Sequence, residues 1–211
     1  MPDPDKTTAW QRSLMERARS FSPATLHEAM GRRGSLPYGI KPIAPEMKVC
    51  GPAVTVISPP MDNLTIHKAI YVAGSGDVLV VFVGGEYEAG YWGEIMTHAA
   101  KQRGIAGLVI DGAARDGHLI REMGFPVFSR GLSIRGTNKG GGGIINHPIT
   151  IGDVCVSPGD LVVGDGDGVV IVPYRDIEQT LVEAQKREEK EEQVKRELSA
   201  GRTTLEIYGW L

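Results

Sequence analysis

The sequence predicts an α/β domain in which a sheet core is joined by a second layer of strands. The first half of the chain alternates predicted helices with short apolar runs, at 78–83 and 107–110, which is typical of parallel strands buried on both faces. The second half has three segments with a turn followed by apolar residues, a pattern typical of a β meander, at 151–157, 160–163 and 168–172. A length of 211 residues fits one domain with a sizeable core.

Composition and charge argue against several classes of partner. The net charge of −3 comes from interspersed acidic and basic residues, so we expect no nucleic-acid partner and no membrane partner. The N-terminus is polar rather than a signal peptide, and the longest uninterrupted apolar run, 78–83, is too short to cross a bilayer. Cys50 and Cys155 lie in apolar runs without metal-ligand spacing, which predicts buried free thiols in a reducing cytoplasm.

Two helices are expected before the first strand. A short helix lies within residues 1–20, behind a disordered start. A second helix begins at Pro23, because Ser22 suits the N-cap and proline suits the first helical position. It runs to Met30, and Gly31 ends it.

The next strand and helix lead towards the centre of the chain. Residues 48–57 alternate and are rich in β-forming residues, but the Gly-Pro pair within them predicts a bulge or an edge position. Asp62 or Asn63 then caps a helix that ends near residue 72. We interpret His67 on this helix as structural rather than functional.

The stretch 93–116, GEIMTHAAKQRGIAGLVIDGAARD, is where we expect a functional site. It predicts a helix over 93–103 ended by a glycine, then a buried strand, then a loop of small residues, 112–114, that leaves space for a ligand. Ligands of α/β sheets bind beyond the carboxyl ends of the strands, and Arg115 and Asp116 follow at that place.

Two features indicate which chemistry the stretch supports. The helix has no Ser, Thr, Asp or Asn at its start, so its first backbone N–H groups are open to an anion such as a substrate carboxylate. The candidate positions are Gly93, Glu94, Ile95 and Met96. Glu94 and Asp116 also bring two carboxylates to one rim, beside the guanidinium of Arg115. Carboxylate oxygens suit Mg²⁺ or Mn²⁺, and arginine suits a fixed oxyanion.

Ordinary explanations exist for the same features. A glutamate in a first helical turn complements the helix dipole, and an Arg-Asp pair in a loop is most often a surface ion pair. His98 lies four residues after Glu94 on the same helical face, but that pair alone is a weak signal and we do not assign it to a metal. Schiff-base chemistry is disfavoured because no lysine occurs between residues 74 and 100 or between 104 and 136.

The C-terminal part of the chain predicts a long helix over 176–199 and an apolar tail over 200–211. The helix is charged nearly all round, so it is either a solvated helix laced with ion pairs or a helix that projects onto another subunit. The tail carries Ile207, Tyr208 and Trp210, and we expect it to pack at a subunit interface.

Glu94, twenty intervening residues, Arg115 and Asp116 resemble the signature of the metal-dependent pyruvate aldolases that cleave 4-hydroxy-4-methyl-2-oxoglutarate and 4-carboxy-4-hydroxy-2-oxoadipate. These enzymes are similar to the regulator of ribonuclease activity A. The resemblance covers nearly all of residues 1–211. It includes TLHEAMGRRGSLP (25–37), NLTIHKAIYVAGSGDVLVV (63–81), the block 135–173 and the charged C-terminal helix.

This resemblance implies an α-β-β-α sandwich of swivelling, phosphohistidine-domain-like topology with a long C-terminal helix. It implies Mg²⁺ or Mn²⁺ held by Asp116 and, through water, Glu94, with Arg115 stabilising charge on the substrate. It also implies a homotrimer, or a homohexamer of paired trimers. In the family a C-terminal glutamate of a neighbouring subunit enters the active site, and Glu191 and Glu192 are both candidates here.

The activity implied is that of a carbon–carbon lyase that releases pyruvate from a 2-oxo acid substrate. Oxaloacetate decarboxylation is an expected second activity, because loss of CO₂ leaves the same enolate. The alternative is a non-catalytic regulator that binds and inhibits a ribonuclease; such regulators resemble this chain less at Glu94. Nucleotide binding and methyl transfer are disfavoured, since neither a G-x-x-x-x-G-K-[ST] loop nor a glycine-rich loop for S-adenosylmethionine is present. The chain departs from the family in having Glu94 for aspartate and no aspartate near Phe82.

Overall fold

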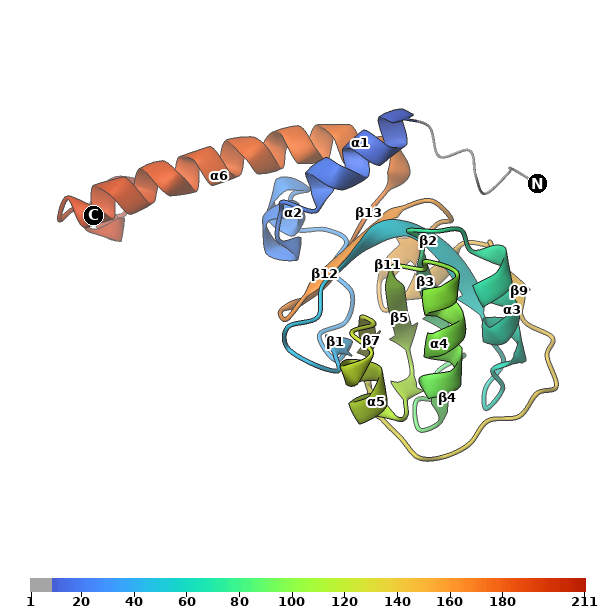
Figure 1. The fold of residues 1–211 in the computed structure, drawn as a ribbon. Coiled ribbons are helices and arrows are strands. Elements are labelled where there is room, and N and C mark those ends of the chain that lie inside the picture. Colours follow the sequence, from blue (N-terminus) through green and yellow to red (C-terminus); the bar gives the residue numbers. More distant parts are fainter. Residues whose placement is uncertain (1–8) are drawn as a thin grey trace.

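The computed structural model describes the chain from residue 9 onward, and the side chains from residue 13 onward. The start that we expected to be disordered lies outside the described residues. The centre of the fold is an eight-stranded mixed sheet in the order β1-β7-β5-β3-β2-β12-β13, with β9 paired to β2 (Figure 1). Its strands are β1 Lys41–Pro42, β2 Val49–Ile57, β3 Val78–Phe82, β5 Gly107–Asp111, β7 Val127–Ser129, β9 Ile144–Ile145, β12 Leu161–Asp165 and β13 Gly168–Val172.

The sheet is parallel at its centre and antiparallel towards its ends. β2, β3, β5 and β7 run parallel, so their carboxyl ends meet at one edge. β12 and β13 continue the same sheet antiparallel to β2, so the expected second layer of strands is part of the main sheet rather than a separate sheet. The remaining meander segment forms a separate ladder, the hairpin of β10 (Ile149–Ile151) and β11 (Val154–Val156).

The sheet curls until its outer strands approach one another. Ser35, just before β1, bridges to Val170 of β13, and Lys41 Nζ of β1 donates a hydrogen bond to the carbonyl of Asp167. The α/β class is therefore confirmed, with a nearly closed sheet, whereas the swivelling topology stays a prediction. The curled sheet encloses an inner core that includes Val80, Val109, Phe128, Val162 and Ile171.

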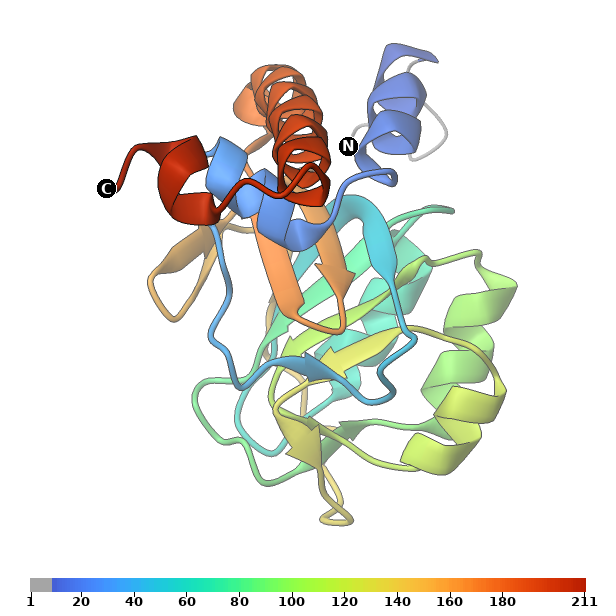
Figure 2. The ribbon, with the colours of Figure 1, turned by 90° about the vertical axis from the view of Figure 1, so that its left-hand side faces the viewer.

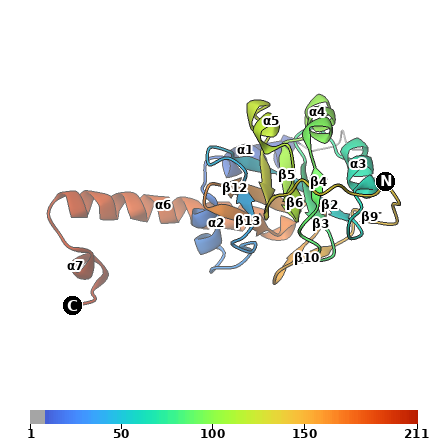
Figure 3. The same ribbon diagram turned by 90° about the horizontal axis from the view of Figure 1, so that it is seen from below.

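Three helices cover the outer face of the parallel strands (Figures 1 and 3). They are α3 (Leu64–Val72), α4 (Glu94–Gln102) and α5 (Gly117–Glu122). Side chains of one strand alternate between cores, so Leu79 of β3 packs under the helices while Val80 fills the inner core. This burial on both faces is the reason why the strands read as continuous apolar runs.

A third core lies on the other side of β12 and β13. It is covered by α1 (Ala9–Ala18), α2 (Pro23–Ala29) and the first turns of α6 (Ile177–Ser199), as Figure 2 shows. The predicted start of α2 is confirmed, since Ser22 Oγ accepts a hydrogen bond from Thr25 N at 3.1 Å.

A small parallel sheet follows the carboxyl ends of the main strands. It consists of β4 (Gly90–Trp92), β6 (Ala113–Ala114) and β8 (Gly131–Leu132). The open loop expected at 112–114 is therefore wrong, because Ala113 and Ala114 form a buried strand between two neighbours. The pairing fixes the backbone immediately before Arg115.

The C-terminal helix α6 confirms the predicted long helix, and it extends away from the body of the molecule (Figures 1 and 3). Its buried side chains lie in the first turns, ending at Ala184, so the second half forms an arm. The arm ends in α7 (Thr204–Tyr208), which leaves Trp210 67% exposed. Within residues 9–211, no helix is long and apolar enough to cross a membrane.

Two local expectations need adjustment. β2 is a continuous strand without a bulge. At Pro52 it pairs with β12 alone, because its pairing with β3 begins only at Ala53. Pro52 therefore has the edge position that proline requires in a sheet. Cys155 is exposed and Cys50 is partly buried, so the prediction of two buried thiols is wrong for Cys155. Its strand, β11, belongs to the small outer hairpin.

Candidate active site

The residues of the predicted site line one cavity of about 220 Å³ at the carboxyl ends of the parallel strands. The start of α4 forms one wall, and β4 and the residues after β6 form another. The lining residues are Asn63, His67, Gly90, Tyr91, Gly93, Glu94, Ile95, Met96, Arg115, Asp116 and Lys139. All six residues that we predicted on the stretch 93–116 are among them.

Asp116 holds the Arg-Asp pair against the start of α4. It adopts a left-handed backbone conformation, with φ of 58°, and forms the N-cap position of α5. Its Oδ2 atom accepts a hydrogen bond from Glu94 N at 3.2 Å and lies 3.5 Å from Arg115 Nε. The backbone N–H of Arg115 donates to Trp92 O at 2.8 Å. The guanidinium and the carboxylate therefore face the same opening.

Gly93 allows this close approach. It is the N-cap of α4 and makes no side-chain cap, as the sequence predicts. A Cβ at this position would lie 2.6 Å from Asp116 Oδ2, which is closer than real Cβ contacts. The first intrahelical bond runs from Thr97 N to Gly93 O, so the N–H groups of Ile95 and Met96 have no helical acceptor. They remain open to an anion.

Glu94 lies at the rim of the cavity. Its side chain is 39% exposed, and Oε1 is 3.8 Å from His98 Nε2, the neighbour expected at i,i+4. Among the residues that the structure describes, no group of three or more His, Cys, Asp or Glu side chains could hold a metal. Asp116 and Glu94 still fit Mg²⁺, because this ion is often held by one or two carboxylates, with waters and substrate completing the shell.

Five residues of the cavity were missed in the sequence. Two of them, Gly90 and Tyr91, belong to β4. The other three come from two elements: Asn63 and His67 from the start of α3, and Lys139 from the glycine-rich segment 139–143. Asp62 joins these two elements, since its carboxylate accepts hydrogen bonds from Leu64 N at 2.9 Å and from Gly140 N. No pattern in the sequence indicates this link, because the two elements are far apart along the chain.

Two sequence interpretations concern residues at these positions. His67 lines the cavity, and its structural role stays a prediction; burial together with the positive charge of Lys139 lowers its pKa. Lys139 brings an amine into the site, so the absence of lysine from the nearby sequence windows does not exclude amine chemistry.

The two candidate glutamates of α6 do not line this cavity in their own chain. Glu191 Oε1 lies 3.0 Å from Arg187 Nε, and Arg187 also approaches Glu28 at 3.6 Å. Glu192 pairs with Lys195 at 2.6 Å. Both glutamates are on the arm that projects from the body (Figure 1), so they could reach only the cavity of another copy.

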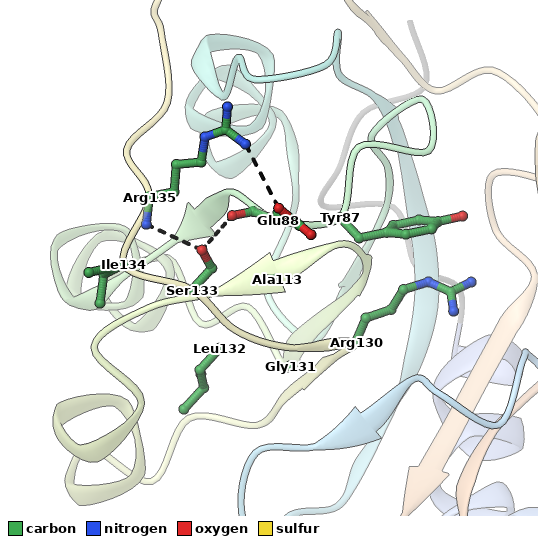
Figure 4. Close-up of a pocket in the computed structure, with 9 residues that line it drawn as sticks. All are labelled: Tyr87, Glu88, Ala113, Arg130, Gly131, Leu132, Ser133, Ile134 and Arg135. Atoms are coloured by element: carbon green, nitrogen blue, oxygen red, sulfur yellow. Dashed lines mark hydrogen bonds and ion pairs between the residues drawn. The ribbon is translucent and has the colours of Figure 1, made fainter.

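A second hollow of about 460 Å³ is lined by Tyr87 and Glu88, by Ala113 of β6 and by residues 130–135 (Figure 4). Its two arginines already have partners: Arg130 Nε binds Asp111 at 2.5 Å, and Arg135 lies 4.0 Å from Glu88. Arg130 also stacks on the ring of Tyr87 at 4.3 Å. Arg115 is paired with Asp116 as well, but its cavity also offers the open N–H groups of Ile95 and Met96 and the side chain of Lys139, so it suits an acidic ligand better than this hollow.

Comparisons with known proteins agree on one family. Residues 23–171 match the RraA-like family model, described as Aldolase/RraA. A Halalkalibacterium halodurans protein named "Putative 4-hydroxy-4-methyl-2-oxoglutarate aldolase" is 37% identical over 190 residues, 90% of each chain. A structure of an uncharacterized protein from Pseudomonas syringae pv. tomato is 30% identical with a TM-score of 0.85, and covers 100% of both chains. Streptomyces coelicolor RraAS2, described as an unusual member of the RNase ES inhibitor RraA protein family, is 30% identical with a TM-score of 0.77, over 87% of this chain and 96% of that one.

Proposed function

The chain belongs to the RraA-like family, and from that premise we propose that it is a divalent-metal-dependent aldolase. Its substrates are 4-carboxy-4-hydroxy-2-oxoadipate or 4-hydroxy-4-methyl-2-oxoglutarate, which it cleaves to pyruvate plus oxaloacetate or pyruvate. One observation carries the proposal: Arg115 and Asp116 lie 3.5 Å apart and line one cavity with the open N–H groups of α4. A cation site, a guanidinium and an anion-binding helix end thus converge on one ligand.

The chain's own groups divide the work of binding. The N–H groups at the start of α4, at Ile95 and Met96, hold the 1-carboxylate of the substrate, helped by the helix dipole. Asp116 and, through water, Glu94 would hold Mg²⁺ or Mn²⁺, which would supply a Lewis acid for the 2-oxo group of the substrate. Arg115, which lines the same cavity, would stabilise the negative charge that develops on that oxygen.

The bond changes follow from that arrangement. Removal of the proton from the C4 hydroxyl lets C4 become a carbonyl while the C3–C4 bond breaks. The electron pair of that bond passes into the pyruvyl half as an enolate, which Arg115 stabilises until C3 is protonated and pyruvate leaves. Oxaloacetate gives the same enolate by losing CO₂, so we propose decarboxylation as a second activity of the site.

Glu191 of a neighbouring subunit is proposed as a further catalytic group. It lies on the arm of α6, away from the cavity of its own chain, and only a second copy could bring it there. This part of the proposal requires a homo-oligomer, a trimer or a pair of trimers. Glu192, one residue further along the same helix, is the alternative.

The proposal is tested by measuring pyruvate release from oxaloacetate and from 4-hydroxy-4-methyl-2-oxoglutarate with Mg²⁺ or Mn²⁺ present. Activity that disappears on adding a chelator and returns with excess metal is the expected result. Activity that is unaffected by the chelator contradicts the metal-dependent mechanism.

A non-catalytic regulator of a ribonuclease is the second candidate. The similarity to Streptomyces coelicolor RraAS2 favours it, since that protein is described within a family of RNase ES inhibitors. It predicts no pyruvate release under any metal condition, together with inhibition of a ribonuclease by the purified chain. The two outcomes separate the candidates in one pair of assays.

A further inference from the structure

Asn63 carries an unpaired hydrogen-bond acceptor at the candidate active site. The residue is 5% exposed and lines the cavity with Arg115 and Asp116. Its Oδ1 has no partner, and it is the sole buried side-chain nitrogen or oxygen in that condition within the described part of the chain. Buried polar atoms in native proteins are nearly always paired, so this one needs an explanation.

The orientation of the Asn63 amide is fixed by its surroundings. Nδ2 donates to Tyr91 O at 2.7 Å and to Met96 Sδ at 3.5 Å. A flipped amide would place Oδ1 against the carbonyl oxygen of Tyr91, two acceptors facing one another. Tyr91 itself is held, because its hydroxyl accepts from Met61 N and donates to Glu86 O, both at 2.9 Å. Oδ1 is therefore the atom left without a hydrogen to accept.

The other groups of the cavity have the opposite need. The N–H groups of Ile95 and Met96, the guanidinium of Arg115 and the ammonium of Lys139 are all donors. A ligand that satisfies them must carry anionic or carbonyl oxygens. A ligand that also satisfies Asn63 must bring a hydrogen, and an O–H group is the donor that a hydroxylated oxo acid offers.

We propose that Asn63 Oδ1 accepts a hydrogen bond from the hydroxyl group of the substrate, and that Asn63 thereby determines a preference for hydroxylated oxo acids. This inference rests on the proposed aldolase function. Oxaloacetate, the decarboxylation substrate, has no such hydroxyl in its keto form, so it leaves Asn63 unpaired. The two proposed activities should thus depend on Asn63 to different degrees, although they share Arg115 and Asp116.

The test compares two substrates in Asn63→Leu, which keeps the size of the side chain and removes the acceptor. We expect kcat/KM for 4-hydroxy-4-methyl-2-oxoglutarate to fall about tenfold or more, and kcat/KM for oxaloacetate to change less than about twofold. Asp153→Asn, on the exposed turn of the β10–β11 hairpin, is the control and should leave both kcat/KM values unchanged.

The loss of the bond to Tyr91 O could unfold Asn63→Leu, so Asn63→Thr is made beside it. Threonine suits the N-cap of α3 and keeps a polar group there, but its side chain ends one bond short of the Oδ1 position, so it removes the acceptor from that place. Equal falls for both substrates in the folded variants would show a structural role and overturn the inference. An unchanged ratio would show that water satisfies Oδ1, and it would overturn the inference too.

Two further measurements separate the remaining explanations. In Lys139→Met the preference for the hydroxylated substrate should persist. If the preference disappears in Lys139→Met while the Asn63 variants keep it, Lys139 is the discriminating group and the inference is overturned.

If the wild type cleaves neither substrate, the proposed function fails, and calorimetry with malate and succinate then tests Asn63 alone. The inference expects malate, in one enantiomer, to bind more tightly, and expects Asn63→Leu to abolish that difference; equal binding of malate and succinate by the wild type overturns it.

Discussion

Arg115 and Asp116 are adjacent in the sequence, but adjacency alone does not make their side chains converge. The left-handed backbone of Asp116, with φ of 58°, turns its carboxylate back towards Arg115 and the start of α4. Aspartate and asparagine tolerate this conformation better than most residues do. The backbone of this one residue is therefore part of the construction of the site.

Asp116→Asn tests the charge of the site without disturbing that backbone. We expect it to abolish both cleavage and decarboxylation while the melting temperature changes little.

Arg115→Ala should lower kcat for both reactions by roughly 10²–10³, the value of one donor to a developing oxyanion. Asp153→Asn, on the exposed turn of the β10–β11 hairpin, is a matched control that should leave both activities unchanged. Loss of one activity alone would contradict the shared enolate.

Gly93→Ala tests the close approach of α4 to Asp116. The new Cβ would lie 2.6 Å from Asp116 Oδ2, so the carboxylate must move and its alignment with Arg115 is lost. Because the backbone of Gly93 is extended, at φ of −149°, alanine fits the main chain and we expect a folded protein with a loss of kcat of about tenfold or more. Gly136→Ala, where a Cβ meets nothing within 4 Å, is the control. Full activity in Gly93→Ala would show that the observed position of the carboxylate is not required.

At the scale of elements, the site is assembled from α4, α3 and the glycine-rich segment rather than from one motif. Asp62 is the joint, since it binds Leu64 N at the start of α3 and Gly140 N in the segment that carries Lys139. Burial opposes the ionisation of Asp62, but these backbone hydrogen bonds outweigh it and lower its pKa below the usual value of 3.8.

This shift makes part of the stability depend on pH. Because the pKa of Asp62 is lower in the folded state than in the unfolded state, its contribution is complete above the unfolded pKa and is lost as pH falls through about 4 and below. Asp62→Asn should therefore lower the free energy of unfolding at pH 7 and show a weaker fall between pH 5 and pH 3. Urea unfolding at a series of pH values measures both. Parallel pH profiles of the two proteins would contradict the assignment.

At the scale of the whole molecule, the arm is the feature that a single chain leaves unexplained. Beyond Ala184 the helix α6 has no buried side chains. The tail that follows it carries exposed apolar residues, which include Trp210 and Leu211. Exposed apolar surface of this kind is typical of a protein interface. The interface predicted for the tail at 200–211 fits this shape and stays a prediction.

Mixing two inactive variants tests whether the arm completes the site of a neighbour. Asp116→Asn lacks an intact cavity, and Glu191→Gln lacks an intact arm. If Glu191 acts in a neighbouring subunit, refolding the two variants together should restore part of the activity, because some sites then combine an intact cavity with an intact arm. Glu189→Gln, on an exposed position of the same helix, should be fully active by itself. No recovery in the mixture, with oligomers of three or six chains still formed, would contradict the role in trans.

The sequence by itself determined the local features of this protein. Glycines, caps and apolar periodicity placed α2, α4, β3, β5 and α6 close to where they lie, and the spacing of Glu94, Arg115 and Asp116 identified part of the lining of the cavity. These signals are short-range, since a cap or a buried strand depends on a few neighbouring residues.

Only the tertiary structure decided the rest. It showed that β12 joins β2 in one curled sheet, that Ala113 and Ala114 form a buried strand, and that Asn63, His67 and Lys139 also line the cavity. Lys139 reaches the site because Asp62 binds a segment almost eighty residues further along the chain. Such contacts depend on the packing of distant elements, and no local preference of the residues involved encodes them.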